Sequence, residues 1–179
     1  MMPRLKVVKI EETTGKVKRI LNAFNSRIGM VPNVFKGMAN SPNLLQATVT
    51  IDRLIGEGKL TGVEQVAVKL VVAQHYGCEY CLAVCTAIGS NRGMSAEQMV
   101  DIRQGRAQDA KHAALLQFTR RMLETKGFVE DGDIADFQAS GYTDEHIAEV
   151  VTIIGAITLG SYFNNMNHTE LDFPKAPDI

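Results

Sequence analysis

Three cysteines lie within eight residues of one another in the segment HYGCEYCLAVCTAIG, which begins at His75. Cys78 and Cys81 form a C-x-x-C pair, and Cys85 follows four residues later. If a helix begins at Cys78, the two sulfurs of the pair lie on one side of its first turn, where a disulfide can form. The free N–H groups and the dipole of that turn stabilise a thiolate, so one sulfur is expected to have a lowered pKa and to be nucleophilic near neutral pH. Cys85 falls on the same helical face as Cys81, close enough to exchange a disulfide or to serve as a third metal ligand.

Other interpretations of the cluster compete with thiol chemistry. Free cysteines are often inert core residues. A zinc ion would take His75 or a solvent molecule as its fourth ligand, but structural zinc sites usually have two separated ligand pairs and this chain has one cluster. The thioredoxin fold also uses C-x-x-C, but it requires strands around the motif, and the flanks here are helical. We therefore favour a redox site and expect no bound metal.

The elements that position this segment are helices. Apolar residues recur at intervals of three and four almost everywhere, with hardly any strict alternation. Ser41 before Pro42 is typical of a helix start, and Thr61 with Glu64 has the spacing of a capping box. We predict an all-α protein with helices at about 12–28, 41–56, 61–76, 78–89, 95–104, 109–126, 131–139 and 143–166.

The length of 179 residues fits a single domain over residues 1–179, with a core at about 25–165 and a C-terminal packing arm at about 166–179. A second packing arm is expected in the segment IGMVPNVFKGMANSPNLLQ, which mixes proline, asparagine and aromatic residues. The last predicted helix is apolar on more than one face. We expect one of those faces to contact another subunit.

The composition argues against several partners. The formal net charge is −1 and the basic residues are scattered, so no nucleic acid partner is expected. The longest apolar stretch, Ile147–Leu159, contains Glu149 and is too short to span a bilayer, and the N-terminus has no signal-like apolar run. No glycine-rich phosphate loop is present, so neither a nucleotide nor a flavin cofactor is expected. We predict a cytoplasmic protein without a membrane partner.

Three stretches of the chain, in the same order, resemble the AhpD-like, carboxymuconolactone decarboxylase superfamily and in particular its peroxidase-related branch. The core resemblance lies in LTGVEQVAVKLVVAQHYGCEYCLAVCTAIG. The branch motif G-x-x-P-N-x-F-x-x-x-A-x-S-P is similar to GMVPNVFKGMANSPNLLQA, and its ending N-H-x-x-x-T-E-x-D-F-P is similar to FNNMNHTELDFP. Together the resemblance covers roughly residues 25–175.

The resemblance implies an all-helical AhpD-like fold, assembly as a trimer or hexamer, and thiol peroxidase activity. It also implies roles for the pair: Cys81 attacks the peroxide and becomes a sulfenic acid, and Cys78 resolves it by forming the disulfide, which is the ordinary fate of a sulfenic acid beside a thiol. Reducing equivalents would come from a partner thiol.

The chain departs from the family at the proton relay. The family's motif continues C-x-x-C-x-x-x-H, and the histidine position is Cys85 here. The branch's glutamate, fourteen residues before the first cysteine, falls on Glu64. Because Glu64 and His75 are eleven residues apart and so share a helical face, they are candidates for a substitute relay. Glu64 as a helix cap alone and Cys85 as a second resolving thiol are the competing interpretations.

These observations favour a thiol-dependent peroxidase or disulfide oxidoreductase that reduces hydroperoxides in antioxidant defence, with an activity weakened by the missing histidine. Two alternatives stay open. One is a lyase resembling carboxymuconolactone decarboxylase, which has no evident need for two neighbouring cysteines. The other is a catalytically slow oligomer that senses redox state.

Overall fold

The computed structural model describes residues 2–107 and 109–179. Over these two ranges the chain forms nine α-helices, one short 3-10 helix and no β-strand, which confirms the predicted all-α class. The elements are η1 (Ile10–Glu12), α1 (Gly15–Ile28), α2 (Asn33–Met38), α3 (Pro42–Gly56), α4 (Gly62–His75), α5 (Glu79–Asn91), α6 (Ala96–Arg103), α7 (Ala110–Glu124), α8 (Asp131–Ala139) and α9 (Asp144–Asn167).

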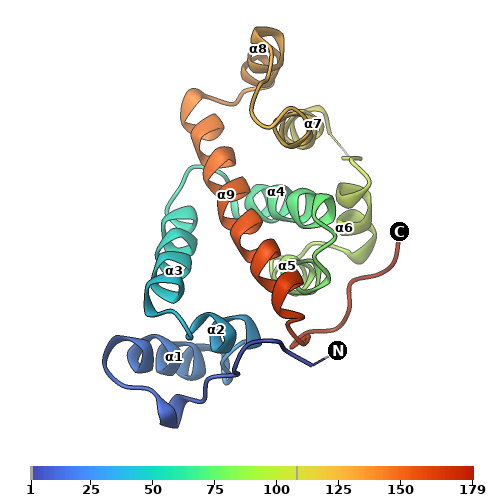
Figure 1. Cartoon of the computed structure of the whole chain (residues 1–179). Helices are drawn as coiled ribbons and strands as arrows, with labels where there is room; N and C mark the ends of the chain where they lie inside the picture. Colours follow the sequence, from blue (N-terminus) through green and yellow to red (C-terminus); the bar gives the residue numbers. More distant parts are fainter. Residues whose placement is uncertain (1, 108) are drawn as a thin grey trace.

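Helix α4 lies at the centre of the main core. Its central residues, Val66–Ala73, are apolar apart from Lys69, and such a helix is stable only when neighbours surround it. It packs against α5, α6, α7 and α9, and Figure 1 shows α9 crossing it. The side chains of Val68, Leu70 and Val72 are completely buried there. Helix α4 therefore fixes the positions of α5 and α9 relative to each other.

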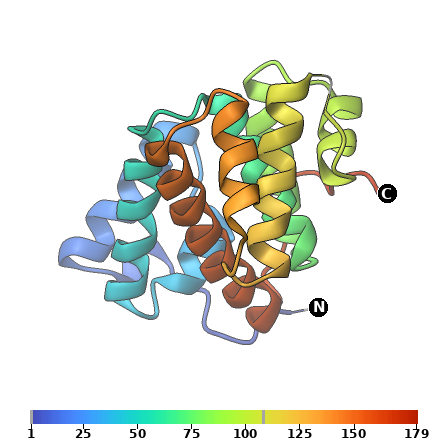
Figure 2. The same cartoon turned by 90° about the horizontal axis from the view of Figure 1, so that it is seen from above.

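The N-terminal helices form a second apolar cluster on the opposite side of α9. Leu21 from α1, Met38 from α2 and Leu45 from α3 pack there with Phe163 of α9. Figure 2 shows these helices on one side of α9, with α7 and α8 side by side on the other. Gly37 permits the close approach of α2, because a Cβ atom there would lie 3.0 Å from the Phe163 ring. Helix α9 thus belongs to both clusters.

Two predicted helix starts are confirmed in atomic detail. The Ser41 side chain accepts a hydrogen bond from the Leu44 amide, with Pro42 as the first helical residue of α3. Thr61 and Glu64 form both halves of a capping box at the start of α4. Because such signals depend only on neighbours along the chain, they can be recognised in the sequence.

Helix α9 is longer than the apolar stretch that the sequence analysis considered. It contains 24 residues and, by length and composition alone, would suffice to cross a membrane. A core helix satisfies the same criteria, and α9 packs against α2, α3, α4, α5 and α7. Its buried face carries the polar residues Ser161 and Asn164.

The segment expected to be a second packing arm contains the short helix α2 (Asn33–Met38), which the sequence analysis did not predict. The reason lies far away in the sequence. The Asp172 carboxylate accepts a hydrogen bond of 2.7 Å from the Asn33 amide and so stabilises the first turn of α2. A residue 139 positions later supplies the cap, which no local pattern can reveal.

After α9 the chain continues as an extended arm over residues 168–179. Its end is held by Arg103, whose guanidinium donates one hydrogen bond of 2.6 Å to the Pro177 carbonyl and another of 2.9 Å to Gln74. Asp172 anchors its middle. The arm therefore closes over the junction between α4, α5 and α9.

Candidate functional site

The C-x-x-C pair lies at the start of α5. The chain leaves α4 through Gly77, whose φ of 58° is in the left-handed region, and Cys78 then caps the next helix. The Cys78 sulfur accepts a hydrogen bond of 3.2 Å from the Cys81 amide, in the manner of a serine cap. This turn places the side chains of Cys78 and Cys81 next to each other, with both in the reduced form.

Cys81 meets two polar side chains from α9. The Ser161 hydroxyl lies 3.5 Å from its sulfur, and the Asn164 amide nitrogen donates a hydrogen bond to that sulfur at 3.6 Å. The thiol is 7% exposed. The hydrogen bond from the Cys78 thiol lowers the pKa of Cys81 to about 7, with burial opposing and with Ser161 and Asn164 assisting. Cys81 is therefore substantially ionised at neutral pH.

The other two cysteines are held as thiols. Cys78 is completely buried, and both its hydrogen bond to Cys81 and its burial raise its pKa well above the ordinary value. Cys85 is 3% exposed, and burial raises its pKa to about 12. The sequence analysis expected one nucleophilic sulfur in the pair, and the pKa values agree with Cys81 in that role. Cys85, in its core position, is not suited to act as a base.

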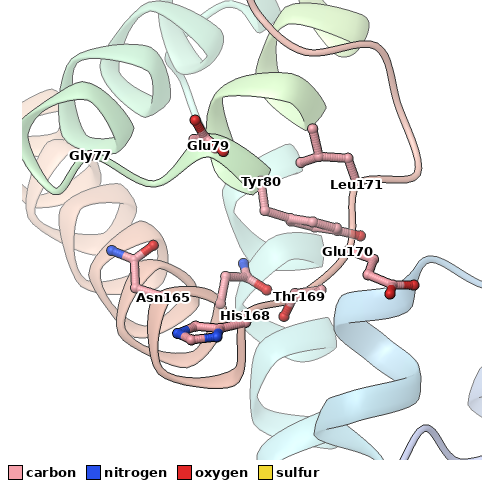
Figure 3. Close-up of a pocket in the computed structure, with 9 residues that line it drawn as sticks. Gly77, Glu79, Tyr80, Asn165, His168, Thr169, Glu170 and Leu171 are labelled. Carbon is pink, nitrogen blue, oxygen red and sulfur yellow. The ribbon is translucent and has the colours of Figure 1, made fainter. Parts of the chain in front are cut away.

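A pocket of about 570 Å³ opens at the start of α5, and neither Cys78 nor Cys81 is among its lining residues. Its lining residues come from the start of α5, the end of α9 and the arm: Gly77, Glu79, Tyr80, Asn164, Asn165, His168, Thr169, Glu170 and Leu171. Figure 3 shows how the labelled side chains surround it. Asn164 belongs both to this wall and to the surroundings of Cys81, and it is 5% exposed. Its amide nitrogen is bonded to the thiol, while its buried carbonyl oxygen has no hydrogen-bond partner among the described residues.

Tyr80 joins the pocket to the arm. Its hydroxyl donates a hydrogen bond of 2.5 Å to the Asp172 carboxylate and accepts one of 3.3 Å from the Val34 amide. Burial and the neighbouring carboxylate raise the pKa of Tyr80, so it stays a neutral donor. The D-F-P ending and the P-N-x-F motif are thus in contact through Asp172.

Glu64 lies at the far end of α4 and is 4% exposed. Its carboxylate accepts hydrogen bonds from the Thr61 amide at 2.7 Å and from the Tyr142 hydroxyl at 2.9 Å. Burial acts to raise its pKa, but those hydrogen bonds and the charge of Lys111, 3.7 Å away, outweigh burial and hold the pKa below the ordinary value. The described contacts make Glu64 a structural carboxylate.

The structure does not join Glu64 to His75. Glu64 is in the first turn of α4 and His75 ends that helix, so eleven residues at about 1.5 Å each separate them along the axis by roughly 16 Å. His75 is exposed, and its ring packs edge-on against Tyr76. The substitute relay proposed from the sequence is therefore wrong as a direct contact. Two residues on the same face of a helix can still be far apart along its axis.

No group of three or more histidine, cysteine, aspartate or glutamate side chains within residues 2–107 and 109–179 could hold a metal ion.

Part of the chain matches a known protein family, and the whole chain is similar in fold to solved structures. The carboxymuconolactone decarboxylase family model matches residues 42–124, which include α3 to α7 and all three cysteines. In structure the chain is similar to the alkylhydroperoxidase AhpD core of an uncharacterized peroxidase-related protein from Ralstonia eutropha JMP134, with a TM-score of 0.88 over 96% of this chain and 93% of that one at 19% identity. The chain therefore has an AhpD-like fold, and residues 42–124 match the carboxymuconolactone decarboxylase family.

Two further structures have the same AhpD-like fold. An uncharacterized peroxidase-related protein from Silicibacter sp. TM1040 gives a TM-score of 0.79 at 19% identity over 95% of both chains. The debrominase Bmp8, in complex with 2,3,4-tribromopyrrole, gives 0.80 at 14% identity over 96% of this chain and 93% of that one. No curated protein matches the chain.

The polar partners of Cys81, Ser161 and Asn164, lie outside the matched range. The sequence analysis did not identify them, because they come 80 and 83 residues after Cys81, and it did not identify Tyr80, because the partner of its hydroxyl is the distant Asp172. A signal was available: α9 is largely apolar, yet Ser161, Asn164 and His168 recur at intervals of three and four, which places a polar stripe on one face.

Proposed function

We propose that this protein is a thiol-dependent peroxidase of the AhpD type, with Cys81 as the attacking thiolate and Cys78 as the resolving thiol. The observation that carries the proposal is the asymmetry of the pair. Cys81 has a pKa of about 7, lies against the pocket-lining Asn164 and is slightly exposed, whereas Cys78 is protonated and completely buried beside it. Reduction of a hydroperoxide by a cysteine pair requires one ionised sulfur that attacks the oxygen and a neighbouring thiol that forms the disulfide.

The first step of the proposed cycle oxidises Cys81. The thiolate attacks the terminal oxygen of a hydroperoxide R–O–OH, so an S–O bond forms and the O–O bond breaks. The sulfur loses two electrons and becomes a sulfenic acid, and the alkoxide leaves as an alcohol after taking up one proton. Asn164 and Ser161 stabilise the thiolate before attack through the contacts already described.

The second step uses Cys78. Its thiol attacks the sulfur of the sulfenic acid, an S–S bond forms, and the hydroxyl group leaves as water with the proton of Cys78. Two exchange steps with an external thiol then return both cysteines to the reduced state. We propose a small hydroperoxide as the substrate and an intracellular thiol as the reductant, in keeping with a cytoplasmic location.

Reductive dehalogenation is a second candidate. The similarity in fold to a debrominase supports it, and so does the pocket of about 570 Å³, which is larger than hydrogen peroxide requires. The lactone decarboxylase alternative is less well supported. Glu79 and Glu170 line the pocket and no lysine or arginine does so among the described residues, which does not suit a substrate rich in carboxylates.

A self-association surface is proposed on the outer face of α9. Val151, Leu159, Tyr162 and Met166 are large apolar side chains that are exposed there. Exposed apolar side chains gathered on one helix are typical of contact surfaces. We propose that this face meets another copy of the chain in a trimer or hexamer.

Single-turnover oxidation of the reduced protein by tert-butyl hydroperoxide, followed by stopped-flow with a count of free thiols, tests the main proposal. We expect the wild type to lose two of its three thiols and Cys81→Ser to lose none. Cys85→Ala is the matched control, and it should react at the wild-type rate because Cys85 lies in the core. Release of bromide from a brominated pyrrole, with no hydroperoxide consumed, would favour the second candidate instead.

A further inference from the structure

In the first step of the proposed cycle, no residue has yet been assigned as the donor of the proton that the leaving alkoxide takes up. The departing alkoxide must be protonated, and the residue at the family's histidine position, Cys85, is buried with a pKa of about 12. Glu64 and His75 do not form a relay near the thiol. The donor therefore has to be found among the residues around the pocket.

His168 is the histidine that lines this pocket. It follows Asn164 by four residues, one turn of helix further along the polar stripe of α9. Figure 3 shows its ring in the pocket between Asn165 and Thr169. Within residues 2–107 and 109–179 neither ring nitrogen forms a hydrogen bond, so the imidazole is free to act on a ligand. His112 and His146, by contrast, are bonded to Asp109 and Thr143 at the starts of α7 and α9.

The backbone holds His168 in an unusual conformation. It ends α9 with a φ of 52° and a ψ of 49°, in the left-handed region that glycine or asparagine normally occupies at such a position. The amide of His168 and that of Thr169 both donate to the Asn164 carbonyl. Asn164 is therefore hydrogen-bonded to the Cys81 sulfur through its side-chain amide and to the backbone of His168 and Thr169 through its carbonyl. A strained residue in a pocket wall points to function rather than to capping alone.

The unpartnered carbonyl oxygen of Asn164 is the second sign of a ligand. A buried polar atom without a partner is costly, and here it belongs to a side chain that lines the pocket and contacts the thiol. Because this oxygen is buried, it can accept a hydrogen bond from the O–H group of a hydroperoxide only after the Asn164 side chain rotates toward the pocket.

We propose that His168 is the general acid of the site and donates its proton to the alkoxide that leaves when Cys81 attacks the hydroperoxide. This inference rests on the proposed function. In the step, the imidazolium loses one proton, the leaving oxygen gains it, and the products are the sulfenic acid, the alcohol and a neutral imidazole. Histidine suits the task because it both holds and gives up a proton near neutral pH.

The test compares two oxidants that differ in their need for a proton. The alkoxide from tert-butyl hydroperoxide requires protonation, whereas peracetic acid releases a carboxylate, which does not. In His168→Asn, whose side chain tolerates the left-handed conformation, we expect single-turnover oxidation by tert-butyl hydroperoxide to slow by about 100-fold and that by peracetic acid by less than about threefold. His112→Asn is the matched control, because His112 is a half-buried histidine outside this pocket, and the change should leave both rates unchanged.

The outcomes separate the proposals. Equal slowing of both oxidants, or no slowing, would overturn the role of His168 while leaving the peroxidase intact. A wild type that reduces tert-butyl hydroperoxide no faster than Cys81→Ser would overturn the proposed function and this inference together. If His168→Asn does not fold, His168→Gly takes its place, since glycine adopts the same backbone conformation freely, and the same criteria apply. The other titratable side chains that line the pocket, Glu79 and Tyr80 from α5 and Glu170 from the arm, are unchanged in the wild type and in all the variants.

Discussion

Replacing Cys78 by alanine should make Cys81 a poorer nucleophile, because the hydrogen bond from Cys78 is the largest influence that lowers its pKa. The pKa of Cys81 falls from the model-compound value of 9.0 to about 7. Two pKa units correspond to about 2.7 kcal/mol. A hydrogen bond to a charged group contributes roughly 1.5–3 kcal/mol, so its loss should raise the pKa of Cys81 to between about 8 and 9.

The rate of alkylation by iodoacetamide as a function of pH measures this pKa directly, and peptide mapping after proteolysis shows which cysteine reacts. At pH 7 the thiolate fraction should drop from about one half to between a tenth and a hundredth, which lowers the alkylation rate about 5- to 50-fold. Cys78→Ser retains a hydroxyl donor and the helix cap and should keep a midpoint near that of the wild type. A midpoint still near the wild-type value in Cys78→Ala would show that the helix terminus and α9, rather than Cys78, set the reactivity of Cys81.

Three further predictions concern the parts that support the site. Tyr142→Phe removes a hydrogen bond to the Glu64 carboxylate and should lower the free energy of unfolding in urea by about 1.5–3 kcal/mol at pH 7. Because the folded state lowers the pKa of Glu64, its contribution is fully present above the unfolded value near 4.5 and is lost as pH falls through the folded value. The difference in stability between the variant and the wild type should therefore shrink as the pH is lowered below 4.5, and a difference that does not change with pH would contradict this. Asp172→Ala should release the C-terminal arm, so that limited proteolysis removes it faster than in the wild type; unchanged cleavage would show that Asp172 does not anchor it. Tyr162→Glu should shift the mass measured by light scattering toward the monomer, whereas a wild type that is itself monomeric would refute the proposed contact surface of α9.

The helices were predictable because their causes are local. Caps such as Ser41 and Thr61 act within three or four residues, and the apolar spacing of α4 and α9 is visible in the sequence. Helix α2 was not predictable in this way. It has six residues, contains Gly37 where α9 approaches, and depends on the distant Asp172 for its cap.

In the candidate site, too, the features with local causes could be predicted from the sequence, and those that depend on distant residues could not. The spacing of Cys78 and Cys81 and the proximity of a helix terminus predict one lowered pKa, because both effects operate within a single turn. The contribution of Asn164 depends on how α9 crosses α5, which the packing around α4 determines. The Glu64–His75 relay failed because periodicity gives the angle around a helix axis and says nothing about the distance along it.

The unequal exposure of the two cysteine residues bears on the return half of the proposed cycle. Cys78 is completely buried and Cys81 is 7% exposed, so we expect an incoming reductant to attack the Cys81 side of the disulfide. The oxidant and the reductant then approach the same sulfur, that of Cys81, one after the other. The mixed disulfide forms on Cys81, and Cys78 is the leaving group. Since a thiol with a raised pKa departs slowly, turnover should be limited by recovery rather than by the encounter with peroxide. A protein organised in this way responds quickly to the first burst of oxidant and slowly to the next.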